Sequence, residues 1–294
     1  MPNDKTAEVP FDKLCDVDKN FVKQETEKKE NPFVIRERNK PTVVVPTLPP
    51  NNKSNINKDT PFETLKAEAE KSDPDALCWL AIAYSAGLNK CKVDKTKMSE
   101  YVERAAKFAD TGSAAAQFCR GVCLFQGYNV NKNQKEAVKW FRKAAEQSFA
   151  PSQERLGMCL LRGIGIAENK TEGFELIRKA AEQDFAPAQF SLGYCYSAGD
   201  GIKEDEKESL KWYLKSAENG DASAQKYVGT VYLLGLAGTE KKLDEALIWF
   251  KKSAAQGDKE ADEIVKRIEK IEKDNAKPAT TKIDTENEKT QRNY

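Results

Sequence analysis

The sequence lacks histidine altogether among its 294 residues. Histidine is the commonest general base, the usual activator of a nucleophilic side chain and the commonest zinc ligand. Its absence excludes the catalytic and metal-binding arrangements that depend on an imidazole. No other motif points to a reaction, so we predict a protein that is not an enzyme and has no catalytic residue, cofactor site or metal site.

Long apolar runs and an excess of one charge are also absent. No segment approaches the ~20 apolar residues that span a bilayer, and the first residues lack the basic start and apolar stretch of a secretory signal. The 48 Lys and Arg nearly balance the 47 Asp and Glu, so no net field attracts nucleic acid or an anionic membrane. We expect a cytoplasmic protein that neither binds nucleic acid nor inserts into a membrane.

Paired cysteine motifs are missing as well. The seven cysteines are an odd number and include no CxxC. In a reducing compartment a free thiol behaves as a small buried hydrophobe. We therefore interpret the cysteines as core residues.

What the sequence does contain is a motif that recurs every 36 residues. A hairpin of two helices this short cannot bury its own apolar face and must stack on its neighbours. The sequence therefore predicts an all-α fold, a right-handed superhelical α/α solenoid of about five helix-turn-helix repeats. Glycines mark two positions of the motif: Gly121, Gly157, Gly193 and Gly229 at the first, and Gly127, Gly163, Gly199 and Gly235 at the second.

The predicted solenoid occupies residues 60–273. A capping box at Thr60-Pro61-Phe62-Glu63 is expected to open its first helix. The first repeat is the longest, because its connector has extra residues within 88–97. The predicted repeats cover residues 74–113, 114–149, 150–185, 186–221 and 222–257, and a capping helix covers residues 258–273.

Both ends of the chain are polar and show no sustained period, so residues 1–59 and 274–294 are predicted to be disordered. The N-terminal tail contains a Pro-rich segment, Pro41-Thr-Val-Val-Val-Pro-Thr-Leu-Pro-Pro50. Such a segment is extended and can dock on an aromatic groove or a sheet edge. The alternative is a stiff solvated spacer.

A glycine inside a helix costs about 1 kcal/mol relative to alanine, so close packing must offset it at the first glycine position. We predict that an aromatic residue of the partner helix packs against this bare backbone. The residues expected in that role are Trp140, Trp212 and Trp249, with Leu176 as the smaller substitute in the third repeat.

The pairs Gly163-Ile-Gly165 and Gly199-Asp-Gly201 resemble a phosphate-binding loop only superficially. A dinucleotide fingerprint needs a preceding strand and a third glycine, and a Walker loop needs Gly-Lys followed by Ser or Thr. These glycines follow a helix, so we predict that they end it in a left-handed turn.

Cys123, Cys159 and Cys195 also recur at the 36-residue spacing. Equivalent atoms of stacked repeats lie about 10 Å apart, whereas a disulfide needs Cβ atoms about 4 Å apart, so these thiols are predicted not to pair. Cys119 and Cys123 could share a metal ion, but two thiolates fall short of a structural zinc set. Core packing is the favoured interpretation.

Once the repeats are aligned, the residues that recur or are echoed between them include Ala188-Gln189, Leu192-Gly193, Gly199-Asp-Gly201-Ile202, Trp212-Tyr213 and Ser216-Ala-Glu-Asn-Gly220. With these residues the repeats resemble the Sel-one-like repeat, a relative of the tetratricopeptide repeat. This resemblance implies a helical superhelix that acts as an adaptor for assembling protein complexes, without shared catalytic residues.

The resemblance to tetratricopeptide arrays implies that one helix of each hairpin lines a concave groove, which would bind a protein or peptide. Residues opposite the core stripe of the first helix are aromatic-rich and differ between repeats, as expected of positions tuned to a ligand. Alternatively, several of them contact the next repeat. The candidates are Phe118, Val122, Phe125, Glu154, Met158, Leu161, Phe190, Tyr194, Ser197, Lys226, Thr230 and Leu233.

The leading hypothesis is therefore a non-catalytic scaffold. Two alternatives remain at this point. One is a bacterial effector delivered into a host cell by a system that reads a C-terminal tail such as residues 286–294. The other is a hydrolase similar to the cysteine-rich members of the repeat family, although those carry disulfides at regular positions and are exported.

Overall fold

The computed structural model describes residues 56–86 and 91–276. Within these ranges every regular element is helical, and consecutive helices pack as pairs. The helices are α2 (Phe62–Glu70), α3 (Pro74–Ala86), α4 (Lys95–Ala106), the 3-10 turn η2 (Ala109–Thr111), α5 (Ala114–Gln126), α6 (Gln134–Glu146), α7 (Ala150–Arg162), α8 (Lys170–Ala181), α9 (Ala186–Ala198), α10 (Glu206–Glu218), α11 (Ala222–Leu234), α12 (Leu243–Ala255) and α13 (Lys259–Ala276).

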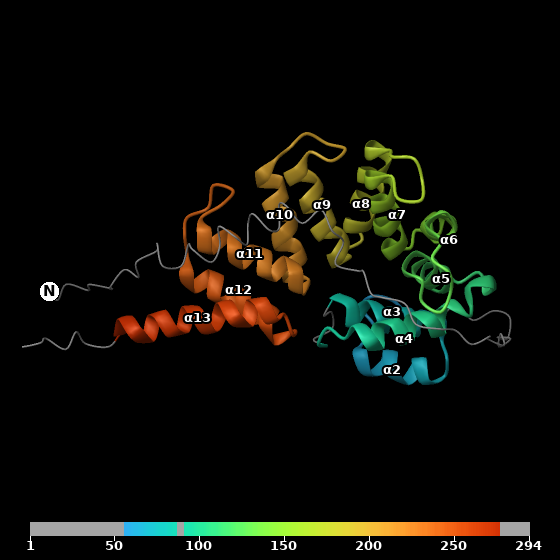
Figure 1. The fold of residues 1–294 in the computed structure, drawn as a ribbon, viewed down its shortest axis with the longest axis horizontal. Coiled ribbons are helices and arrows are strands. Elements are labelled where there is room, and N and C mark those ends of the chain that lie inside the picture. Colours follow the sequence, from blue (N-terminus) through green and yellow to red (C-terminus); the bar gives the residue numbers. More distant parts are fainter. Residues whose placement is uncertain (1–55, 87–90, 277–294) are drawn as a thin grey trace, which may run out of the picture.

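The helix pairs stack into an arch that curves back on itself (Figure 1). Helices α3, α5, α7, α9 and α11 are the first helices of the five hairpins, and α4, α6, α8, α10 and α12 are the second. The backbone N–H of Val93, in the first connector, donates to the carbonyl of Gln256 at the end of α12 (3.1 Å). The all-helical repeat array predicted from the sequence is confirmed, and its two ends meet.

The close contact predicted at the helical glycines exists, but the tryptophans do not make it. A Cβ atom on Gly121 would lie 2.5 Å from Cε1 of Phe141, and one on Gly193 would lie 3.0 Å from the ring of Tyr213. Ile177 and Phe250 take the same role against Gly157 and Gly229. In these four repeats the residue that contacts the glycine directly follows the residue predicted from the sequence.

The tryptophans instead lie about 100° further round the second helix, as neighbouring helical positions must. Trp140, Trp212 and Trp249 are only partly buried. A lysine three residues on covers each ring: Lys143 at 4.3 Å, Lys215 at 5.3 Å and Lys252 at 3.8 Å from the ring centroids. The prediction for these tryptophans and for Leu176 was therefore wrong by one residue.

A ladder of amide hydrogen bonds joins the two helices of each regular repeat. Gln147 Nε2 donates to Gln117 Oε1 at 2.9 Å, and Asn219 Nδ2 donates to Gln189 Oε1 at 2.8 Å. The third and fifth repeats have the same pair, Gln183 to Gln153 and Gln256 to Gln225. Each bond satisfies the largely buried amide of the first helix, which would otherwise be costly to bury.

The glycine pairs between helices are structural, as predicted. Gly163 and Gly199 end α7 and α9 with φ of 63° and 67°, in the left-handed region. The second glycine of each pair also has positive φ, and a Cβ atom on Gly165 would clash with the backbone of Gln134 in the preceding repeat. The loop is therefore shaped by helix termination and stacking.

The start of the array differs from the predicted capping box. Helix α2 begins at Phe62, and Pro61 occupies the N-cap position, where no side chain caps the helix. The hydroxyl of Thr60 accepts instead from the N–H of Asn57 (3.0 Å), in a turn that precedes the helix. Glu63 pairs with Lys66 (3.0 Å).

The long first connector runs from the end of α3 to the start of α4. Residues 87–90 of it lie outside the described ranges, while Cys91 to Asp94 lead into α4. At the other end, α13 reaches Ala276 and so includes residues that were predicted to belong to the C-terminal tail. Residues 1–55 and 277–294, and with them most of both predicted tails, lie outside the described part of the chain.

The six cysteines of the described residues are free and buried. The ladder of Cys123, Cys159 and Cys195 does not pair, as predicted. Burial raises the pKa of Cys159 to about 11 and that of Cys195 to about 12, so both thiols stay protonated at neutral pH. The spacing argument missed one contact, because Cys119 on α5 and Cys78 on α3 interact across two repeats.

The glycine contact gives a stability prediction. Gly121→Ala should destabilise the fold by about 1–3 kcal/mol, because the added methyl overlaps the fully buried ring of Phe141, although the helix gains up to about 1 kcal/mol in propensity. Urea unfolding followed by circular dichroism measures the change. Gly229→Ala is the matched control with a smaller expected loss, since its Cβ would lie 3.0 Å from Phe250. Equal stability of the wild type and the Gly121 variant would contradict this account.

Candidate functional site

The first helices form one continuous inner surface, because their N-terminal ends make contacts from one repeat to the next. Trp79 on α3 touches two aromatic rings that precede other first helices: its centroid lies 5.7 Å from that of Phe149 and 6.2 Å from that of Phe185. Phe118 on α5 joins them, 5.8 Å from Phe149. This aromatic cluster joins the first three repeats, and Phe185 extends it to the start of α9.

A polar cluster continues the inner surface toward the C-terminal repeats. The hydroxyl of Ser191 on α9 donates to Oε1 of Glu154 on α7 (2.9 Å). Asp221 caps α11 by accepting a hydrogen bond from the N–H of Ala224 (2.8 Å). The negative charge of Glu154 acts to raise the pKa of the Asp221 carboxyl. Burial raises the pKa of Asp221 to about 6, while the backbone hydrogen bonds oppose that rise.

Lys226 supplies the opposite charge at the end of this cluster. Its ammonium lies 3.4 Å from Asp258 and 2.7 Å from Glu260, so it bridges α11 to the start of α13. These contacts raise its pKa although burial acts in the other direction. Lys226, which was predicted to contact a binding partner, thus joins the last hairpin to the terminal helix α13.

The structure divides the predicted groove residues into two sets. Several are buried and offer little surface to a partner, because the first helices of neighbouring repeats pack against one another. Phe118 and Glu154 contact the start of the next repeat or its first helix, as the alternative considered from the sequence has it. Phe125 and Leu161 instead pack against the second helix of their own hairpin. The buried residues are Phe118, Phe125, Glu154, Leu161, Thr230 and Leu233, the partly buried ones are Val122, Met158, Phe190 and Lys226, and the exposed ones are Tyr194 and Ser197.

Two tyrosines remain as exposed aromatic side chains on α9 and α11. Tyr194 is 38 % exposed and Tyr227 is 36 % exposed. Tyr227 lies against the buried ring of Tyr213 with centroids 4.1 Å apart, and Phe190 contacts the same ring at 5.1 Å. Sequence reasoning missed Tyr227, which directly follows the predicted Lys226. The sequence signal that could have identified Tyr227 is its place beside Lys226, because a helical pattern fixes which residues share a face only to within about 100°.

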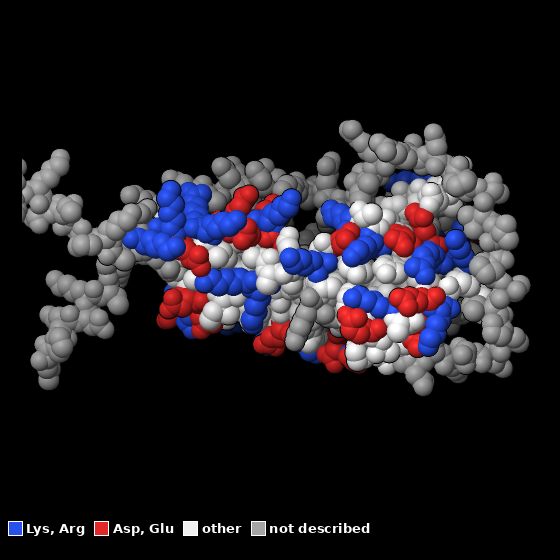
Figure 2. Space-filling view, turned by 90° about the horizontal axis from the view of Figure 1, so that it is seen from below, with Lys and Arg blue, Asp and Glu red and all other residues white. Residues whose placement is uncertain are grey.

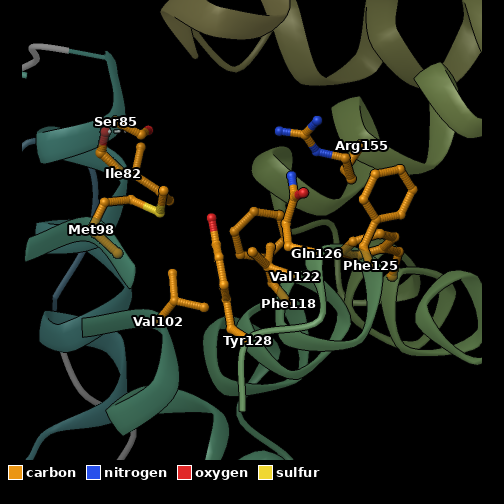
Figure 3. Close-up of a pocket in the computed structure, with 12 residues that line it drawn as sticks. Ile82, Ser85, Met98, Val102, Phe118, Val122, Phe125, Gln126, Tyr128 and Arg155 are labelled. Carbon is orange, nitrogen blue, oxygen red and sulfur yellow. Dashed lines mark hydrogen bonds between the residues drawn. The ribbon is translucent and has the colours of Figure 1, made fainter. Parts of the chain in front are cut away.

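An apolar pocket opens between the first two hairpins (Figure 3). It has a volume of about 60 Å³. Its walls come from α3 and α4 on one side and from α5 and the loop after it on the other, and three of the predicted groove residues line it. The lining includes Ile82, Met98, Val102, Phe118, Val122, Phe125 and Phe141.

The pocket exists because the first repeat has smaller side chains than the others. In register with the second repeat, Val102 stands where Phe141 stands, and Ser85 stands where Phe125 stands. Ala81 correspondingly replaces the glycine of the other repeats. The missing aromatic volume is not refilled, so a cavity remains beside the first hairpin.

Polar groups surround the mouth of this pocket. Figure 3 shows the hydroxyl of Tyr128, the amide of Gln126 and the guanidinium of Arg155 turned toward the space between α3 and α5. All three can donate hydrogen bonds. Apolar walls with a few polar groups at the rim are the usual make-up of a ligand-binding cavity.

Figure 2 shows both signs of charge interspersed over one face, with Lys and Arg gathered at the end formed by α12 and α13. Some of these cations are paired, such as Lys251 with Glu269 and Lys266 with Asp262. Within the described residues, no group of three or more His, Cys, Asp or Glu could hold a metal ion, and no helix is long and apolar enough to cross a membrane.

The buried Asp221 carboxyl gives a pH prediction. Its folded pKa of about 6 exceeds the unfolded value of 3.8, so its stabilising contribution is complete below about pH 4 and is lost as the pH rises through 6. Asp221→Asn keeps a capping oxygen but does not ionise. The variant should therefore gain on the order of 2–3 kcal/mol relative to the wild type between pH 4 and pH 7.

Urea unfolding at several pH values measures this difference. Asp258→Asn is the matched control, because Asp258 also caps a helix of this array but its carboxylate lies 3.4 Å from the ammonium of Lys226. A stability difference between wild type and Asp221→Asn that does not change with pH would contradict the raised pKa.

Comparison with known proteins identifies the family to which these repeats belong. The family model for the Sel1 repeat matches residues 74–107, 114–149, 150–185, 186–221 and 222–258, together more than half of the chain. No curated protein matches the sequence.

Solved structures show the same repeat. A Sel1 repeat protein from Oxalobacter formigenes is 31% identical, with a TM-score of 0.50 over 70% of this chain and 80% of the other. The protein c5321, a protective antigen of uropathogenic Escherichia coli with an SLR fold, is 28% identical with a TM-score of 0.48 over 70% of this chain, and this chain spans 44% of its length. The five matched repeats show that the chain belongs to the Sel1 repeat family.

Proposed function

We propose that this protein is a non-catalytic adaptor that binds a protein or peptide partner on its inner surface. Sel1 repeats form helical arrays that typically mediate protein–protein contacts, which supports this role. The observation that carries the proposal is a contrast between two sets of positions on the first helices. One set recurs in every regular repeat, and the other changes from repeat to repeat.

The recurring set holds the hairpins together. It consists of the helical glycine and the glutamine that bonds to the second helix. The changing set lies one position after the glycine and is occupied by Val122, Met158 and Tyr194, which are partly buried or exposed, and by Thr230, which is buried. The stacking of hairpins requires the recurring glycine and glutamine but does not determine which residue follows the glycine. Variation at that following position is therefore expected if it is selected to bind a particular ligand.

The exposed part of the inner surface has the chemistry of a protein-binding site. Tyrosine is enriched at energetically important contacts because its ring buries apolar area while its hydroxyl keeps a hydrogen-bond partner. Tyr194 and Tyr227 supply two such side chains, and the pocket of the first hairpin supplies a concave apolar site.

A cytoplasmic location is part of this proposal. The six described thiols are free and buried, which suits a reducing compartment. Free thiols also distinguish the described part of this chain from the disulfide-bonded members of the repeat family, so the hydrolase alternative gains no support here.

Substitution of the exposed tyrosines tests the adaptor role. Tyr194→Ala and Tyr227→Ala, alone and together, should lower the affinity for a captured partner about tenfold or more, because removal of an interface hot spot typically costs at least 2 kcal/mol. The partner is first identified by affinity capture and mass spectrometry, and its affinity is then measured with purified components.

Ile248→Ala is the matched control, since Ile248 is 54 % exposed on the second helix α12, away from the inner surface. This variant should bind as the wild type does. Equal loss of binding in the control, or full binding by the double tyrosine variant, would contradict the assignment of the inner surface. Far-UV circular dichroism checks that helicity is unchanged in each variant.

A further inference from the structure

We propose that the pocket of the first hairpin is occupied by a side chain of the same polypeptide: Leu48 in the Pro-rich segment 41–50. This segment lies outside the described residues, so the argument rests on the pocket, on the point where the described chain begins and on the chemistry of the segment. The proposal goes beyond the adaptor role and does not depend on it.

The size of the pocket selects the kind of side chain. Its volume of about 60 Å³ is less than half of the ~150 Å³ that holds a benzene ring. An aromatic ring is therefore too large, whereas a branched aliphatic group of about four carbons fits. The walls match such a group, because Ile82, Met98 and Val102 present only carbon and sulfur.

The described chain begins near α3, which forms one wall of the pocket. Ile56 packs against the large core cluster, and the ring of Phe62 lies 5.7 Å from that of Tyr84 on α3. Lys58 is close enough to Asp184 to lower its pKa, and Phe185, the next residue, touches Trp79 on α3. The first described residues therefore lie near α3, and an occupant supplied by the preceding segment would start from there.

From that entry point the pocket is within reach. Ile82 and Ser85 follow Trp79 by three and six residues on α3, which is about 4.5 and 9 Å along the helix axis. The eight residues from Leu48 to Ile56 span at most about 26 Å when fully extended. This reach exceeds the distance along α3 from Trp79 to the pocket residues, so the connection is long enough for Leu48 to reach the pocket from the region of α3.

The segment has the chemistry that the pocket and its rim require. Residues 41–52 contain no charged side chain, and residues 41–50 include four prolines, which favour an extended backbone. Less conformational entropy is then lost on docking than for a flexible chain. Proline keeps its carbonyl and lacks an N–H, so this backbone mainly accepts hydrogen bonds, and the rim of Gln126, Tyr128 and Arg155 mainly donates them.

Docking in this way would place the Pro-rich segment on the inner surface beside the predicted groove. A partner that uses the first two repeats would then compete with the segment. The segment would act as a tethered, weak occupant whose effective concentration is set by the short connection to Ile56.

Methyl NMR of the full chain tests the proposal. The sequence has three methionines, Met1, Met98 and Met158, so ¹³C-methyl labelling gives a simple spectrum with one probe in the pocket. Leu48→Asp should shift the Met98 methyl resonance, because a carboxylate does not enter the apolar pocket. Met158 on α7 lies outside the pocket lining and serves as the internal reference. Val34→Asp is the matched control in the same tail and should leave Met98 unchanged.

A second variant blocks the pocket itself. Ser85→Phe introduces the residue found at the equivalent position 125 of the second repeat and should fill the cavity. The Leu48→Asp substitution should then have no further effect on Met98. Far-UV circular dichroism checks that the Ser85 variant retains its helicity.

Addition of a synthetic peptide of residues 41–52 identifies the occupant. The peptide should shift Met98 in the Leu48→Asp chain but hardly in the wild type, where the pocket is filled. An equal shift in both chains would mean that the wild-type pocket is open to other peptides, and a Met98 shift that changes with chain concentration would assign the site to a second copy. Either result, or a Met98 resonance insensitive to Leu48→Asp, would overturn the proposal.

Discussion

The close approach of the two helices in each hairpin, made possible by a glycine in the first helix, is the constraint on which the rest of the structure depends. The bare backbone of Gly121 lies directly against Phe141, and the same contact recurs with Ile177, Tyr213 and Phe250. Because this distance is fixed in each regular repeat, the amide ladder can form and the hairpins stack with one geometry. The arch follows from repeating that unit until its ends meet at Val93 and Gln256.

The first repeat shows what happens when this constraint is relaxed. It has Ala81 at the glycine position, Val102 at the aromatic position, and Leu77 and Phe108 where the later repeats have the bonded amides. The apolar pair replaces the hydrogen bond without leaving a buried polar group unsatisfied, so the hairpin still closes. The smaller side chains leave the pocket, so this cavity lies beside the most irregular of the five repeats.

Much of the fold could be predicted from the sequence, and less of the site. The 36-residue period located the hairpins, and the turn glycines were correctly assigned as helix ends. The tryptophans were placed against the glycine although the next residue makes that contact, because a helical pattern fixes which residues share a face only to within about 100°. Phe118 was predicted to meet a partner, but the aromatic cluster with Trp79 and Phe149 buries it.

The sequence by itself determined the repeat, its all-helical character and the family, since these depend on local spacing and on contacts within one hairpin. Only the tertiary structure decided which side chains of the first helices remain accessible. Access depends on how far the array curves, and curvature sums small rotations between successive repeats. The curvature of the array brings into contact residues as distant in sequence as Trp79 and Phe185. No local sequence pattern encodes that contact.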